Sequence, residues 1–130
     1  MPYDLTERSF DFSKNIVLFI KESHFDKMFK SILDQLPKSA TSIGANIIEG
    51  KSGNSRKNLI SFYSIALRSA NETKYWLRLL KETAKTNEKQ IELLEDECHE
   101  ISKILAKSII TLKKNDQNIK KKNDQNIKLK

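Results

Sequence analysis

The fold is decided by residues 59–80, LISFYSIALRSANETKYWLRLL. Apolar and small residues recur there at alternating spacings of four and three over three heptads: Leu59, Tyr63, Ala66, Ala70, Thr73, Leu77 and Leu80. This period is typical of a helix that buries one stripe against neighbouring helices. A second row runs beside the first and is apolar at both ends, so we expect this helix to touch a subunit interface as well as the core. The second row comprises Phe62, Ile65, Ser69, Glu72, Trp76 and Leu79.

Two helices are expected before this stretch. Apolar spacing predicts the first over residues 6–23, and Asp26 is a candidate N-cap for the second. Pro37 lies in the middle of the second helix, and we expect a kink or a short break there because proline lacks the backbone donor and crowds the preceding turn. Residues 39–46 are small and would let another helix approach closely, and residues 50–54 end the helix.

One helix is expected after this stretch. Ser55 is a candidate cap for the long third helix, and Asn87 followed by Gln90 resembles a capping box that opens the fourth. The fourth keeps heptad spacing as far as Leu112. Four helices with short connections predict an all-α protein, an antiparallel up-down four-helix bundle over residues 1–112.

Residues 113–130 have a different character. The octapeptide KKNDQNIK at 113–120 is repeated without change at 121–128. Its low hydrophobicity and its many lysines and asparagines give it no core to join, so we expect a basic tandem-repeat tail that is frayed or disordered. This tail could act as an electrostatic arm, or it could be a neutral by-product of duplication.

Composition limits the class of protein. A chain of 130 residues with 38% hydrophobic content can form one modest core. It has no apolar run near the roughly 20 residues that span a bilayer, and no signal-peptide pattern, so we expect a cytoplasmic protein with no membrane partner. The single cysteine, Cys98, falls on the apolar stripe of the fourth helix and is interpreted as a packing residue.

The formal charge of +7 is distributed unevenly along the chain. Residues 1–54 are neutral, residues 55–87 carry +5, residues 88–112 carry −3 and residues 113–130 carry +5. Lysine far outnumbers arginine, which indicates an AT-rich genome, and such a bias raises basicity without selection for nucleic acid.

The third helix carries a basic ridge, which we define as Lys74, Arg78, Lys81 and Lys85. A ridge at this spacing can follow a line of phosphates, so with Lys113 and Lys114 it supplies the candidate nucleic-acid-binding residues. Two alternatives are a solvated face and internal pairing with an acidic row of the fourth helix. That acidic row comprises Glu92, Glu95, Asp96 and Glu100.

Motifs that would indicate catalysis are incomplete. Residues 50–52, GKS, imitate the end of a phosphate-binding loop, but Ala45 stands where the loop requires glycine, and a helix precedes it instead of a strand. Asp96 and His99 make the only approximate metal-binding pair, and His24 has no such partner. With no nucleophile constellation either, we expect no catalytic residue, no metal or cofactor, and no enzyme activity.

Four polar residues fall near the apolar rows: Asn46, Glu49, Arg68 and Glu72. One interpretation is a structural polar network, which would also include Asn71, that fixes helix register or forms a ligand site. The other is an ordinary satisfied hydrogen bond between helices.

Two stretches carry a family resemblance. Residues 39–50, SATSIGANIIEG, and residues 66–80, ALRSANETKYWLRLL, resemble the signatures of the 23S rRNA intervening-sequence, or S23-type, four-helix-bundle proteins. The resemblance covers roughly residues 6–112. Pro37 departs from it, since leucine is more usual there. What it implies is a bundle that assembles into a ring, with a homopentamer favoured, and that has no known catalytic activity.

The same resemblance extends to the accessory variability determinant of diversity-generating retroelements, which binds nucleic acid and a reverse transcriptase through a basic surface. Our leading hypothesis is therefore a non-enzymatic oligomeric accessory factor, of the rRNA intervening-sequence or retroelement type, whose partners are RNA or DNA and a reverse transcriptase. The alternative is a ring-forming scaffold that binds a protein partner without nucleic acid. A carboxylate-metal enzyme is a third, weaker alternative.

Overall fold

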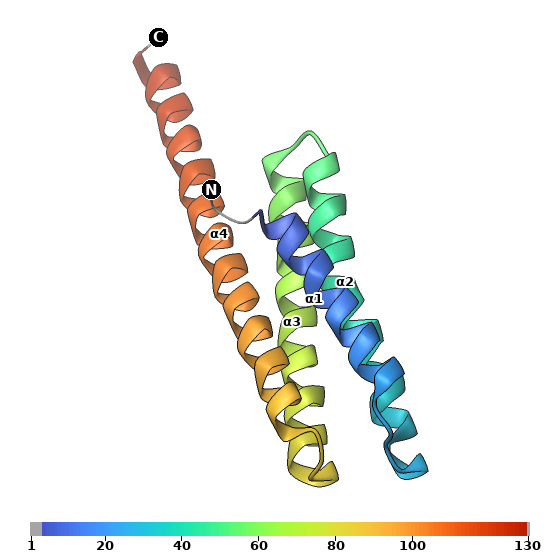
Figure 1. Cartoon of the computed structure of the whole chain (residues 1–130). Helices are drawn as coiled ribbons and strands as arrows, with labels where there is room; N and C mark the ends of the chain where they lie inside the picture. Colours follow the sequence, from blue (N-terminus) through green and yellow to red (C-terminus); the bar gives the residue numbers. More distant parts are fainter. Residues whose placement is uncertain (1–3, 130) are drawn as a thin grey trace.

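The chain forms four helices in an up-down arrangement in this computed structural model, which describes residues 4–129 (Figure 1). Residues 1–3 and Lys130, the last residue of the predicted tail, lie outside the described residues. Consecutive helices run in opposite directions, which confirms the predicted antiparallel four-helix bundle. The elements are α1 (Leu5–Glu22), η1 (Lys27–Phe29), which leads into α2 (Lys30–Ser52), α3 (Arg56–Ala84) and α4 (Glu88–Leu129).

Side-chain caps fix three helix starts. Asp26 accepts a hydrogen bond from the backbone N–H of Met28 at 3.0 Å, and Ser55 accepts one from that of Asn58 at 3.0 Å. Both predicted caps are confirmed, although Asp26 caps the 3₁₀ turn that precedes α2. Asp4 caps α1 in the same way. Each cap satisfies a backbone donor that a helix start leaves free.

The short break expected at Pro37 does not occur, because α2 is continuous through it. Leu36 and Ala40, on either side of the proline, are fully buried, so packing holds the helix across the missing hydrogen bond. The Thr41 hydroxyl also donates to the Pro37 carbonyl at 2.7 Å.

The capping box expected at Asn87 is wrong as well. Asn87 has φ of 55°, whereas an N-cap residue is extended. Lys85, the C-cap residue that follows α3, also has a left-handed backbone conformation, with φ of 54°. Two non-glycine residues in the left-handed region therefore make the turn between α3 and α4, and a capping pattern in the sequence does not reveal such a turn.

Close approach of α2 to its neighbours organises the core. Thr73 Oγ1 of α3 lies 2.9 Å from Ser39 Oγ, and both residues are buried. A Cβ on Gly50 would lie 3.0 Å from Phe62 Cβ, which is tighter than an ordinary contact, so a larger residue there would push α2 and α3 apart by a few tenths of an ångström. On the other side of α2, a Cβ on Gly44 would already touch Ser9 of α1 at 3.4 Å. Small residues thus let α1 and α3 both pack tightly on α2.

The C-terminal third of α4 extends beyond the bundle, past the α2–α3 connection (Figure 1). We call residues 113–126 the α4 extension. It is helical, and all of its residues except the half-buried Asp116 are exposed. Fraying of this segment in solution stays a prediction. None of the described helices is both long and apolar enough to cross a membrane.

Replacing Ala70 with leucine tests the packing of α3. Ala70 is fully buried, and there is no space for the isobutyl side chain of leucine in place of its methyl group. We therefore expect the free energy of unfolding to fall by about 1–3 kcal/mol. Urea denaturation measures it. The matched variant Ala45→Leu, at an exposed alanine of α2, should change stability little; equal losses in both variants would contradict the packing.

Cys98 provides a chemical test of the core. Burial raises the pKa of its thiol from 9.0 to about 12, and Sγ lies 3.3 Å from the Ala70 carbonyl oxygen. The thiolate fraction near pH 8 should then be about a thousandfold smaller than in the unfolded chain. We expect alkylation to be very slow in the native protein and fast in urea. Rapid alkylation of the native protein would show that α4 does not hold Cys98 in the core.

Candidate nucleic-acid interface

The basic ridge lies along a groove between α3 and α4. The groove has a volume of about 490 Å³ and places cations of α3 opposite carboxylates of α4. Its lining consists of Lys74, Arg78, Lys81, Glu92, Glu95, Asp96 and His99. Three ridge residues therefore share one groove with the acidic row, although the Arg78 side chain is still 73% exposed.

Three of the four ridge cations have partners within the chain. Lys81 Nζ lies 2.7 Å from Glu95 Oε1, and this hydrogen bond raises the pKa of Lys81. Arg78 Nε lies 3.3 Å from Glu82 Oε1, one turn further along α3. Lys74 Nζ donates to Ser102 Oγ of α4 at 3.2 Å. The structure therefore favours internal pairing over a free phosphate-binding ridge.

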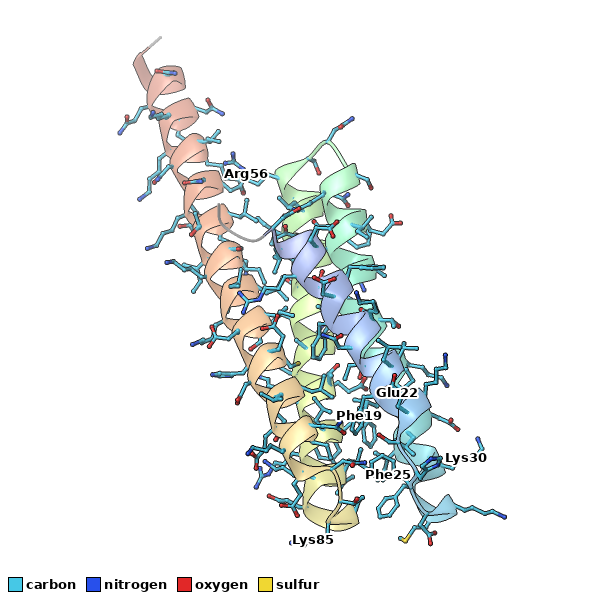
Figure 2. The ribbon with its side chains drawn as sticks, in the orientation of Figure 1. Phe19, Glu22, Phe25, Lys30, Arg56 and Lys85 are labelled. Carbon is cyan, nitrogen blue, oxygen red and sulfur yellow. The ribbon has the colours of Figure 1, made fainter. Side chains whose placement is uncertain are left out.

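The fourth ridge residue, Lys85, is set apart from the groove. It ends α3 at the tip of the turn that leads to α4, where it is exposed (Figure 2). The structure therefore does not combine the four ridge residues into one cationic surface.

Exposed lysines outside ion pairs occur on the α4 extension. It carries five lysines, and none of them belongs to an ion pair within the described part of the chain. Two are the predicted Lys113 and Lys114, and the others are Lys120, Lys121 and Lys122. These last three were overlooked as site residues because the repeat lacks apolar spacing. Only the continuation of α4 beyond Leu112 shows that these lysines lie on one helix.

Two more cations lie in the first turn of α3, and one of them, Arg56, lies beside α4, where it lines a pocket with Leu112 (Figure 2). Arg56 is half-buried and Lys57 is exposed, and neither forms an ion pair among the described residues. The first turn of a helix carries partial positive charge, so cations there are electrostatically unfavourable unless an anion is near. The sequence pattern did not indicate Arg56 and Lys57 as site residues.

The predicted polar network is not assembled as a unit. Asn46 donates to the carbonyl and hydroxyl oxygens of Ser42 at 2.7 and 2.9 Å, and Ser42 in turn hydrogen-bonds to Ser69 of α3. Of the other members, Glu49, Arg68 and Glu72 are all exposed. Only Asn46 therefore takes part in an interhelical network, with serine partners that the sequence pattern did not identify.

The GKS sequence is the last turn of α2, not a loop. Gly50 is buried against α3, and Lys51 Nζ contacts Asp4 Oδ1 at 3.2 Å and Thr6 Oγ1 at 2.8 Å. Lys51 thus links the end of α2 to the start of α1. Among the described residues, no group of three or more His, Cys, Asp or Glu side chains is placed to hold a metal ion.

A long-range ion pair also joins α1 to α4. Arg8 Nε and Nη2 each donate at 2.8 Å to the Glu97 carboxylate, and both side chains are only partly exposed. This bidentate pair raises the pKa of Arg8. It spans two helices that are far apart in the sequence, and helix periodicity alone gives no sign of it.

Comparisons with known proteins agree with this fold. No curated protein matches the chain. A crystal structure at 1.70 Å resolution of a protein with unknown function, from the S23 ribosomal protein family of Bacteroides thetaiotaomicron VPI-5482, is similar, with 35% sequence identity and a TM-score of 0.71. The similarity covers 82% of this chain and 98% of that chain. The family model described as 23S rRNA-intervening sequence protein matches residues 2–107. This match covers most of the sequence, and the chain belongs to the 23S rRNA-intervening sequence protein family.

Proposed function

We propose that this protein is a non-enzymatic, oligomeric nucleic-acid-binding factor that contacts phosphates mainly through the α4 extension. The observation that supports this most is the group of five exposed lysines on that extension, none in an ion pair among the described residues. Asp116 and Asp124 leave the extension with a net charge of +3.

The extension suits a charged, regularly spaced partner. Fourteen helical residues reach about 21 Å, which is the length of about six phosphates along one DNA strand. Arg56 and Lys57 lie at the same end of the bundle and add positive charge next to the base of the extension. Binding of this type depends on counterion release and carries little sequence preference.

The oligomeric part of the proposal rests on exposed apolar side chains along α1 and α2. Phe10, Val17 and Ile48 are 58%, 48% and 50% exposed. Phe10 and Val17 are seven residues apart on one stripe of α1, next to the serines that contact α2. We call these three exposed residues the apolar patch and assign them to the candidate subunit interface. The ring, with a pentamer favoured, stays a prediction from the family resemblance.

The alternative is a ring-forming scaffold that binds a protein partner without nucleic acid. Its support is the set of internal contacts of Lys74, Arg78 and Lys81, which makes the basic ridge less available to phosphates. A reverse transcriptase stays a predicted partner under the leading hypothesis.

Neutralising the extension tests the leading hypothesis. The variant with glutamine at Lys113, Lys114, Lys120, Lys121 and Lys122 should bind labelled single-stranded RNA or DNA more weakly. The logarithm of the affinity falls as the logarithm of the salt concentration rises, and each lost phosphate contact makes this slope shallower by about 0.7. The slope of the variant should therefore be shallower by up to about 3.5. Titrations at several salt concentrations measure it.

A matched variant controls for charge loss elsewhere. Lys74→Gln, Arg78→Gln and Lys81→Gln together remove three cations from the groove, and binding should change little because Arg78 and Lys81 are paired with carboxylates and Lys74 is hydrogen-bonded to Ser102. The reverse result, with loss in the groove variant and none in the extension variant, would place the site on the ridge. If the wild-type protein binds neither RNA nor DNA, the scaffold alternative is favoured.

The proposed apolar interface has its own test. Val17→Lys with Ile48→Lys places two charges in the patch, so the mass measured by light scattering in about 1 M salt should fall towards that of a single chain. Met28→Lys is the matched control, because Met28 is 75% exposed near the α1–α2 turn and lies outside the patch. An unchanged mass in the double variant would exclude this patch as the interface.

A further inference from the structure

Charge is strongly segregated along α4. Residues 88–100 contain six acidic residues and one lysine, for a net charge of −5. Residues 101–126 contain seven lysines and two aspartates, for a net charge of +5. One continuous helix therefore carries a net charge of −5 on its first 13 residues and a net charge of +5 on the next 26.

Part of this charge lies on a single solvent-facing stripe. At 100° per residue, its members fall within a sector of about 80°. All are exposed, and we call them the α4 stripe: Glu92, Asp96, Glu100, Lys103, Lys107, Lys114 and Lys121. Ile110, which is 55% exposed, falls in the same sector near the middle of the stripe.

The α4 stripe is complementary to itself when reversed. If a second α4 lies antiparallel, with a two-fold axis close to Lys107, Glu92 of each copy comes opposite Lys121 of the other. Glu100 comes opposite Lys114 in the same register; its exposed ion pair with Lys103 of its own helix, at 3.0 Å, would be shared with or exchanged for this contact. Because the axis repeats every contact, four attractive pairs form, and the exposed Ile110 side chains are covered close to the axis. The unfavourable contacts lie at the axis, where Lys107 of the two copies meet and Lys103 of each copy lies opposite Ile110, one turn from Lys107 of the other.

We propose that α4 pairs antiparallel with α4 of a second copy of this chain through the α4 stripe. This deepens the proposed function, since it names a protein partner for Lys114 and Lys121, which the nucleic acid would also contact. Self-pairing and nucleic-acid binding then compete for these lysines. The contact lies on α4, away from the apolar patch of α1 and α2, and it is electrostatic, so salt distinguishes the two interfaces.

Light scattering on the full chain tests the pairing. We expect the mass in about 0.1 M salt to be twice that in about 1 M salt, where the screening length falls from about 10 Å to about 3 Å. Glu92→Lys with Glu100→Lys makes the stripe basic, and Lys114→Glu with Lys121→Glu makes it acidic. Each variant alone should lose the doubling, with a dissociation constant at least about tenfold higher. An equimolar mixture should regain it, because all four pairs are then attractive again, two with the original sign and two with the sign reversed.

The register has a separate test. Lys107→Gln removes the like-charge contact at the axis and should strengthen self-association, whereas Lys114→Gln removes an attractive pair and should weaken it. Non-specific attraction between basic and acidic regions would weaken both. Glu49→Lys with Glu72→Lys is the matched control, because both carboxylates are exposed on other helices, and it should keep the doubling.

The results separate this pairing from the proposed function. A wild-type mass that does not change with salt, or a mixture that fails to regain the doubling, would overturn the pairing. The Glu92→Lys, Glu100→Lys variant keeps every lysine of the extension, so salt-sensitive RNA binding by it would leave the proposed function intact. Conversely, a rescued mixture together with a wild-type protein that binds no RNA or DNA would support the pairing and remove the proposed function.

Discussion

The close approach of α1 and α3 to α2 is the constraint on which the rest of the structure depends. Helices whose side chains are small at the contact can bring their backbones together, and α2 has such residues on two faces. Gly44 meets Ser9 of α1, while Gly50 meets Phe62 of α3. Hydroxyl pairs such as Ser39 with Thr73 fix the register, because a one-turn shift would leave both hydroxyls buried without each other. With α1 to α3 held in this way, α4 closes the bundle through Leu77, Leu80 and its own apolar stripe.

This constraint explains why the sequence predicted the fold well and its details less well. Heptad spacing and small residues identified the four helices and a close approach of another helix to α2, since these patterns reflect burial directly. The short break expected at Pro37 was wrong because packing around Leu36 and Ala40 opposes the local cost of a proline, and no local pattern shows this packing. Asn87 was misjudged because several turn geometries are compatible with the same polar residues, and the structure uses a left-handed one.

The candidate site was harder to predict than the fold, for a related reason. Spacing shows which residues share a face, but a charge acts according to what lies opposite it. The ridge at Lys74, Arg78 and Lys81 has regular spacing, yet Glu95 and Ser102 come from a helix on the other side of a turn. For Lys120, Lys121 and Lys122 the error was the opposite one: the sequence pattern did not indicate them, although they are exposed. They follow no apolar pattern, and their availability depends on α4 continuing past the end of its partners.

The α4 extension links stability to binding. Tertiary packing does not stabilise it, because its side chains are exposed, and asparagine and aspartate are weak helix formers. Lysines near a helix C-terminus interact favourably with the helix dipole, but five of them along 14 residues also repel one another. An anionic partner removes that repulsion, whether it is a strand of phosphates or the acidic half of another α4. Binding energy and helix stability are then coupled: a partner that neutralises the lysines also orders the helix that presents them, and part of the interaction energy is used in that ordering.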